Sequence, residues 1–124
     1  MTNRMGSRDR EWQALLDAWR PPHRPEGWVS AALWELLEPA AQEPVLRRLF
    51  PWASMNELHV SETGYFCDYH AEPFPAIAAS TDGFVVMAHP WGVENVVLRS
   101  PDPGAALSCM VRLLDEAVPG RRAV

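Results

Sequence analysis

The chain has 124 residues, of which 48% are hydrophobic, and it carries a formal net charge of −5. A chain of this length is typical of one domain, and its apolar content suffices for a buried core, which argues against intrinsic disorder. The negative charge argues against nucleic acid as a partner, because phosphate binding requires a positively charged face.

The first helix is predicted from "SRDREWQALLDAWR", which starts at Ser7, a suitable N-cap. Four apolar residues recur at the spacing of one helix face: Trp12, Leu15, Leu16 and Trp19. The next segment, "RPPHRPEG", contains three prolines and a glycine, so the helix cannot continue through it.

Prolines also mark the limits of two shorter predicted helices. The segment "SAALWELLE" is predicted as a helix that Ser30 caps and that ends before Pro39. The segment "EPVLRRLF" can place its proline in the first helical turn, where a missing N–H costs nothing. This third helix is expected to end at Phe50, because the proline that follows disfavours helical backbone there.

From Asn56 the apolar period becomes that of strands. The segment "ELHVS" places Leu58 and Val60 on one face and His59 and Ser61 on the other. The segments "PAIAAS" and "FVVMAH" flank "TDG", and the Asp-Gly pair predicts a hairpin between them. Further strands are predicted at "GYFCDYH", residues 64–70, and "ENVVLRS", residues 94–100.

The last helix is predicted to open at Pro103 with Asp102 as its cap and to stop before Pro119. Its buried stripe comprises Leu107, Met110, Val111 and Leu114. The order of elements favours an α+β fold, with N-terminal helices, an antiparallel sheet of four to five strands and a C-terminal helix packed on the sheet.

We expect one domain over residues 1–124. It would contain a helix and a proline-rich linker over 1–27, an α+β core over 28–118 and a frayed tail over 119–124. The N-terminus lacks the apolar segment of a signal peptide, and no apolar run approaches the length of a membrane span. We therefore expect a cytoplasmic protein with reduced thiols and no membrane partner.

The richest polar segment is "HVSETGYFCDYH", in which His59, Cys67 and His70 are potential metal ligands. If residues 64–70 form a strand, Cys67 and His70 point to opposite faces, so we expect no metal and no cofactor. The plainer interpretation is that Cys67 is a small buried apolar residue and that the histidines lie at the surface.

Two kinds of catalysis stay open. Either Cys67 or Cys109 can pair with a histidine as a nucleophile, although no glycine-rich elbow supports this. Carboxylates in the same region can supply acid–base pairs. The weak catalytic candidates are therefore Glu57, His59, Glu62, Cys67 and His70, and we lean towards a protein without enzymatic activity.

Six tryptophans are many for so short a chain. Trp12, Trp19 and Trp34 fit helix stripes, where core packing or a dimer interface explains them. The other three lie in turns beside glycine or proline and are candidates for a ligand-binding surface, although they can also clamp loops onto the core: Trp28, Trp52 and Trp91.

The segments "VLRRLFPWASMNELHVSETGYF" and "GFVVMAHPWGVENVVLRSPDPGAALSCMVRLLDEA" resemble a family of uncharacterised domains. Its members are usually labelled natural product biosynthesis proteins and are common in actinomycetes. The resemblance covers roughly Val45 to Ala117 and leaves out the first helix and the linker. The family signature falls on Phe50, Pro51, Trp52, Met55, Glu57, Leu58, His59 and Ser61. The chain departs from it at Glu62-Thr63, where the family has Arg-Cys.

The resemblance implies a natural-product pathway. Within it we expect an accessory protein whose tryptophan-rich surface binds a small-molecule or peptide precursor, a pathway enzyme or a second copy of the chain in a homodimer. The alternatives are a small tailoring enzyme without cofactor, which uses residues 57–70, and a self-protection protein. An enzyme requires His59, Glu62 and His70 to converge in a pocket. A binding role requires exposed tryptophan.

Overall fold

The computed structural model describes residues 4–20, 28–54, 56–63, 74–80, 82–88 and 95–117. The helices are α1 (Arg4–Trp19), α2 (Trp28–Ala40), α3 (Pro44–Arg47) and α5 (Pro103–Ala117). The strands are β1 (Phe50–Ser54), β2 (Glu57–Ser61), β3 (Ala76–Ser80), β4 (Gly83–Met87) and β5 (Val96–Ser100). The predicted α+β fold, with N-terminal helices and a C-terminal helix, is confirmed.

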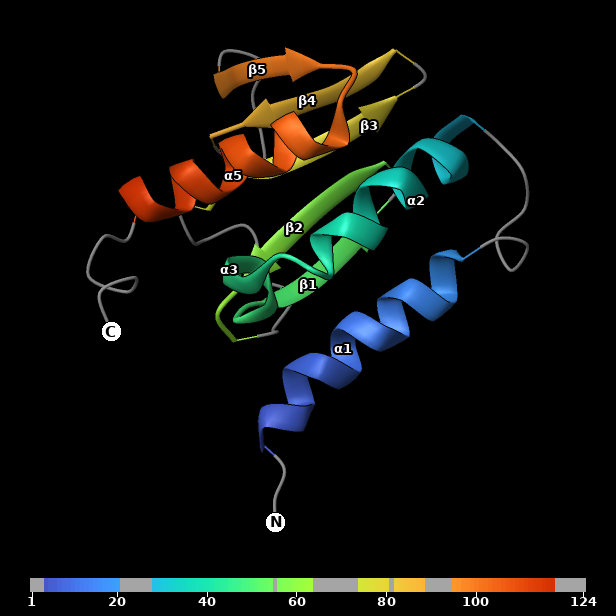
Figure 1. The fold of residues 1–124 in the computed structure, drawn as a ribbon, viewed down its shortest axis with the longest axis vertical. Helices are drawn as coiled ribbons and strands as arrows, with labels where there is room; N and C mark the ends of the chain where they lie inside the picture. Colours follow the sequence, from blue (N-terminus) through green and yellow to red (C-terminus); the bar gives the residue numbers. More distant parts are fainter. Residues whose placement is uncertain are drawn as a thin grey trace.

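The five strands form one antiparallel sheet in the order β1-β2-β3-β4-β5. The helices lie on one side of this sheet: α5 over β3 to β5, α2 over β2 and β3, and α1 beside β1 and α2 (Figure 1). Side chains alternate along each strand, so every strand turns one set of residues to the helices and the other set to a second face.

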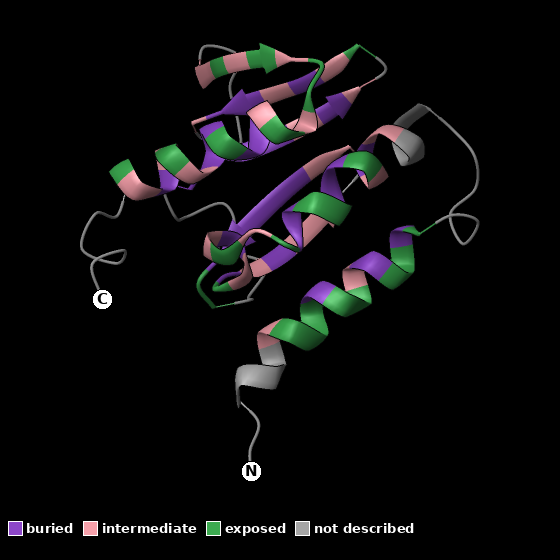
Figure 2. Ribbon diagram, in the orientation of Figure 1, coloured by how far each residue is buried: buried purple, intermediate pink, exposed green. Residues whose placement is uncertain are grey.

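The core lies between the helices and the first face of the sheet, where the buried sides of the ribbons meet (Figure 2). On α1 the predicted stripe is buried at Trp12, Leu16 and Trp19, and its fourth residue, Leu15, is partly buried against the core. The indole N–H of Trp12 donates a hydrogen bond of 3.0 Å to the carbonyl oxygen of Leu49. This bond joins α1 to the connection between α3 and β1.

The segment after α3 corrects the sequence prediction. The third helix was expected to reach Phe50, but α3 ends at Arg47, and the segment Phe50–Ser54 is the edge strand β1. An edge strand tolerates Pro51, because half of its N–H groups face away from the neighbouring strand and need no partner there. Strand β2, predicted at "ELHVS", is confirmed.

Two helix boundaries also differ from the prediction. Helix α1 begins at Arg4, so Ser7 lies inside it and does not cap it. Helix α2 begins at Trp28 and includes Pro39. Proline in the last turn removes one backbone hydrogen bond, and the buried residues Leu36 and Leu37 hold this end of the helix on the core.

The C-terminal half follows the sequence closely. Strands β3 and β4 form the predicted hairpin. Gly83, the first residue of β4, has a φ of 131°, which glycine adopts readily. The carboxylate of Asp102 accepts hydrogen bonds of 3.2 Å from the N–H groups of Gly104 and Ala105, so it caps α5 as predicted. The strand predicted at 64–70 and the tail at 119–124 lie outside the described residues.

Candidate functional site

Three residues of the family signature meet on the second face of the sheet, and we call them the histidine cluster: Trp52, Glu57 and His59. Trp52 of β1 lies directly opposite His59 of β2 in the antiparallel register. The centroids of their rings are 5.1 Å apart with 44° between the ring planes. The pairing of β1 with β2 therefore determines this contact, because residues opposite each other in antiparallel strands bring their side chains together.

Glu57 joins the cluster because it stands two residues before His59 on the same strand and so shares its face. Nε2 of His59 lies 3.0 Å from Oε1 of Glu57, which is the distance of a hydrogen bond. The imidazole side chain is 3% exposed, and the carboxylate side chain is 25% exposed. The carboxylate thus connects a buried imidazole to the surface and fixes which way the ring is turned.

This arrangement corrects the expectation of a surface position for His59. His59 does point away from the helices, as the alternation of β2 predicts, but it is buried on the second face. Ser61, two residues further along the strand, is fully buried there as well, and its Oγ accepts a hydrogen bond of 3.2 Å from the N–H of Thr63. Both faces of β2 are therefore buried.

Helix α1 contacts the start of β1, two residues before Trp52. The guanidinium carbon of Arg8 lies 5.1 Å from the centre of the Phe50 ring, and Phe50 pairs with Ser61. Nε of Arg8 is buried and makes no hydrogen bond within the described part of the chain. Asp9, next to it, forms an ion pair with Arg47, which anchors α1 to α3.

The other predicted site residues are distributed as follows. Glu62 follows β2 and is exposed. Cys67, His70 and Trp91 lie outside the described residues, as does the side chain of Trp28. The structure therefore brings together Trp52, Glu57 and His59. The convergence of His59, Glu62 and His70, which an enzyme would require, is not tested, because His70 lies outside the described residues.

The described residues contain little that supports metal or thiol chemistry. No group of three or more His, Cys, Asp or Glu side chains among them is arranged to hold a metal ion. Cys109 is a free thiol, but it is buried in α5, where Nη2 of Arg112 lies 3.7 Å from its sulfur. A thiol turned into the core is not accessible to a substrate, so Cys109 is a packing residue.

Among the described helices, none combines the length and the apolar character that a membrane crossing requires. No curated protein and no solved structure matches the chain. A family model matches residues 9–119, which include most of α1, all five strands and α5. The match therefore begins well before Val45, where the resemblance in the sequence began. The chain belongs to the family of unknown function DUF6193.

Proposed function

We propose that the protein is a non-catalytic accessory component of a natural-product pathway and binds a pathway precursor or a partner enzyme through the histidine cluster. One observation carries the binding site: a partly exposed tryptophan and a partly exposed carboxylate flank a buried imidazole on the sheet face opposite the helices. The pathway context rests on the resemblance, whose signature includes all three residues.

The chemistry of the cluster suits recognition. Indole presents a large rigid surface at a small cost in conformational entropy, and a neighbouring carboxylate adds a directional acceptor. The imidazole, held 3.0 Å from that carboxylate, fixes its orientation. A ligand with a flat apolar part and a hydrogen-bond donor or positive charge is therefore the best match for this surface.

The test is deletion of the gene in its host, followed by complementation and comparison of the secondary metabolites. An accessory role predicts a lower yield of the pathway product without accumulation of one intermediate. The wild-type gene and a Trp34→Leu control should restore the yield, because Trp34 lies on α2 away from the cluster, with the guanidinium of Arg20 5.6 Å from its ring. Trp52→Leu should not restore it.

One observation favours a tailoring enzyme as the second candidate. The Glu57 carboxylate is 25% exposed, and the buried imidazole 3.0 Å from it fixes its orientation, as a positioned general base requires. In that case the deletion strain and the Glu57→Gln strain should accumulate the same intermediate, the substrate of the missing step. An unchanged metabolite profile would contradict both candidates, and loss of viability only during production would indicate self-protection instead.

A further inference from the structure

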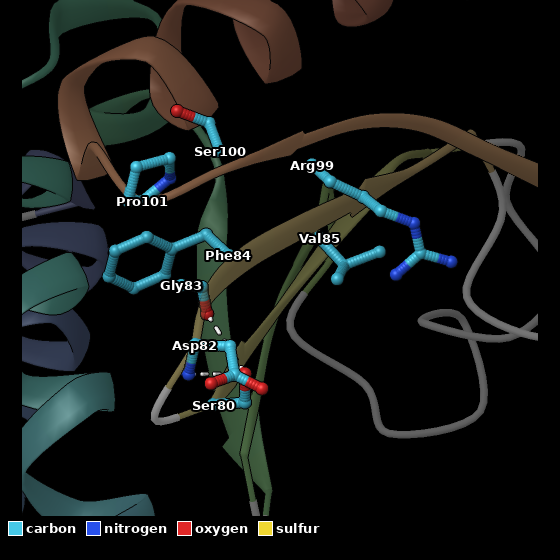
Figure 3. Close-up of a pocket in the computed structure, with 8 residues that line it drawn as sticks. All are labelled: Ser80, Asp82, Gly83, Phe84, Val85, Arg99, Ser100 and Pro101. Carbon is cyan, nitrogen blue, oxygen red and sulfur yellow. Dashed lines mark hydrogen bonds between the residues drawn. The ribbon is translucent and has the colours of Figure 1, made fainter.

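A second site candidate lies at the end of the sheet where the β3–β4 hairpin turns and β5 leads into α5. It is a pocket of about 280 Å³ lined by Ser80, Asp82, Gly83, Phe84, Val85, Arg99, Ser100 and Pro101 (Figure 3). The lining residues come from β3, β4, β5 and the turns beside them, and none comes from β1 or β2. The pocket is therefore separate from the histidine cluster.

The turns beside this pocket are held by local hydrogen bonds of two serine side chains. Oγ of Ser80 accepts a bond of 3.2 Å from the N–H of Asp82 and lies 3.3 Å from the carbonyl oxygen of Gly83. Oγ of Ser100 accepts a bond of 3.1 Å from the N–H of Asp102. A Cβ at Gly83 would lie 2.7 Å from the carbonyl oxygen of Ser100, so the two walls touch where the glycine stands. The backbone on both sides of the pocket is therefore fixed by strand pairing and by local hydrogen bonds.

Two opposite charges line the pocket without neutralising each other. Asp82 and Arg99 are both exposed, and neither takes part in an ion pair within the described residues. In Figure 3 the guanidinium of Arg99 and the carboxylate of Asp82 stand apart, with the apolar side chain of Val85 between them, while the ring of Phe84 points to the other side. Across the pocket a positive group, Arg99, is thus followed by an apolar one, Val85, and then by a negative one, Asp82.

This order selects the charge of the ligand. A simple anion would be attracted by Arg99 and repelled by Asp82, and a simple cation the reverse. A zwitterion can place an opposite charge beside each side chain and is attracted by both. A guanidinium matches a carboxylate in a two-point geometry, and a carboxylate accepts hydrogen bonds from an ammonium group. The pocket volume is about that of nine water molecules in liquid water. This size suits a ligand smaller than a typical drug.

We propose that this pocket binds a free α-amino acid with an apolar side chain. The carboxylate of the ligand pairs with Arg99, its ammonium group pairs with Asp82, and its side chain lies against Val85, which stands between them. The assignment does not depend on the function proposed above, because it concerns other residues and another part of the sheet.

The experiment is a titration of the ¹⁵N-labelled full chain with L-leucine, followed by two-dimensional ¹H–¹⁵N NMR. We expect the amide signals of Gly83 and Arg99 to shift in a saturable way, with a dissociation constant on the order of 1 mM, since exposed charges contribute little. N-acetyl-L-leucine lacks the ammonium group and L-leucinamide lacks the carboxylate, so each should bind about three- to five-fold more weakly.

Variants test the two charges from the side of the protein. Asp82→Asn should weaken L-leucine binding by about three- to five-fold and leave the affinity for N-acetyl-L-leucine unchanged, because that analogue has no ammonium group. Arg99→Gln should weaken L-leucine binding by a similar factor and leave the affinity for L-leucinamide unchanged, because that analogue has no carboxylate. The matched controls Glu38→Gln and Arg48→Gln remove exposed charges outside the pocket lining and should bind like the wild type. Absence of shifts at the pocket, binding of both analogues as tight as that of L-leucine, or unchanged affinity for L-leucine in both pocket variants would overturn the proposal.

Discussion

The contact between Glu57 and His59 makes a specific prediction about stability. Truncating the carboxylate in Glu57→Ala removes the acceptor that lies 3.0 Å from Nε2 of an imidazole that is only 3% exposed. The N–H of a buried ring then loses this acceptor in a place that water reaches poorly, which is more costly than losing an exposed hydrogen bond. His59→Phe removes the other partner and keeps an aromatic ring opposite Trp52.

The two substitutions should lower the free energy of unfolding by different amounts. Glu57→Ala should lower the free energy of unfolding by about 2 kcal/mol, within the range for a buried polar group that has lost its partner. His59→Phe should cost about 1 kcal/mol, because the remaining carboxylate is 25% exposed and stays hydrated. The double variant should be more stable than the sum of the single effects implies, by about 1 kcal/mol, because it leaves no partner behind.

Urea unfolding of the four chains, followed by circular dichroism, measures this cycle. For a protein of this size a loss of 2 kcal/mol moves the unfolding midpoint by about 1 M. Glu38→Ala, on the exposed side of α2, is the matched control and should change the stability by less than about 0.5 kcal/mol. Strict additivity of the two single variants would refute the reasoning, since the groups would then not interact in solution.

Three further changes have defined expectations in the same unfolding assay. Trp12→Phe should cost about 2–3 kcal/mol, because it leaves the buried carbonyl of Leu49 without the indole N–H and opens a small cavity; a loss under about 0.5 kcal/mol would contradict that bond. Gly83→Ala should cost about 1–3 kcal/mol, because the new Cβ meets the Ser100 carbonyl oxygen at a positive φ; an unchanged midpoint would rule out this close approach. Asp102→Ala should cost about 1 kcal/mol through loss of the α5 cap, and Asp102→Asn should retain most of it.

The residues of the C-terminal half carry enough local information to predict their structure. The Asp-Gly turn, the alternating strands around it and the Asp102 cap each depend on neighbours a few residues apart, and all three are found as expected. The stripe of α1 is of the same kind, because its period alone indicates which residues are buried. Helix boundaries depend on more than the local sequence, since α2 continues through Pro39, where packing outweighs the local preference.

The segment around the histidine cluster shows what local reasoning missed. Phe50, Trp52 and Ser54 alternate with Pro51 and Ala53, and this period of two was the available signal for β1. A proline can also mark the end of a helix, which is how the sequence prediction treats Pro51. Whether Pro51 ends a helix or lies within a strand depends on whether that strand is at an edge of the sheet. That position is a property of the whole sheet and not of the five residues.

The sequence by itself therefore determined the α+β class, the hairpin, the capped last helix and the face of β2 on which His59 stands. Only the tertiary structure decided that this face is buried at His59 and Ser61, that Trp52 lies opposite the imidazole, and that Arg8 of α1 covers Phe50. The physical reason is the range of the interactions: alternation and capping act between near neighbours, whereas burial and cross-strand pairing depend on residues that the chain brings together only when it folds.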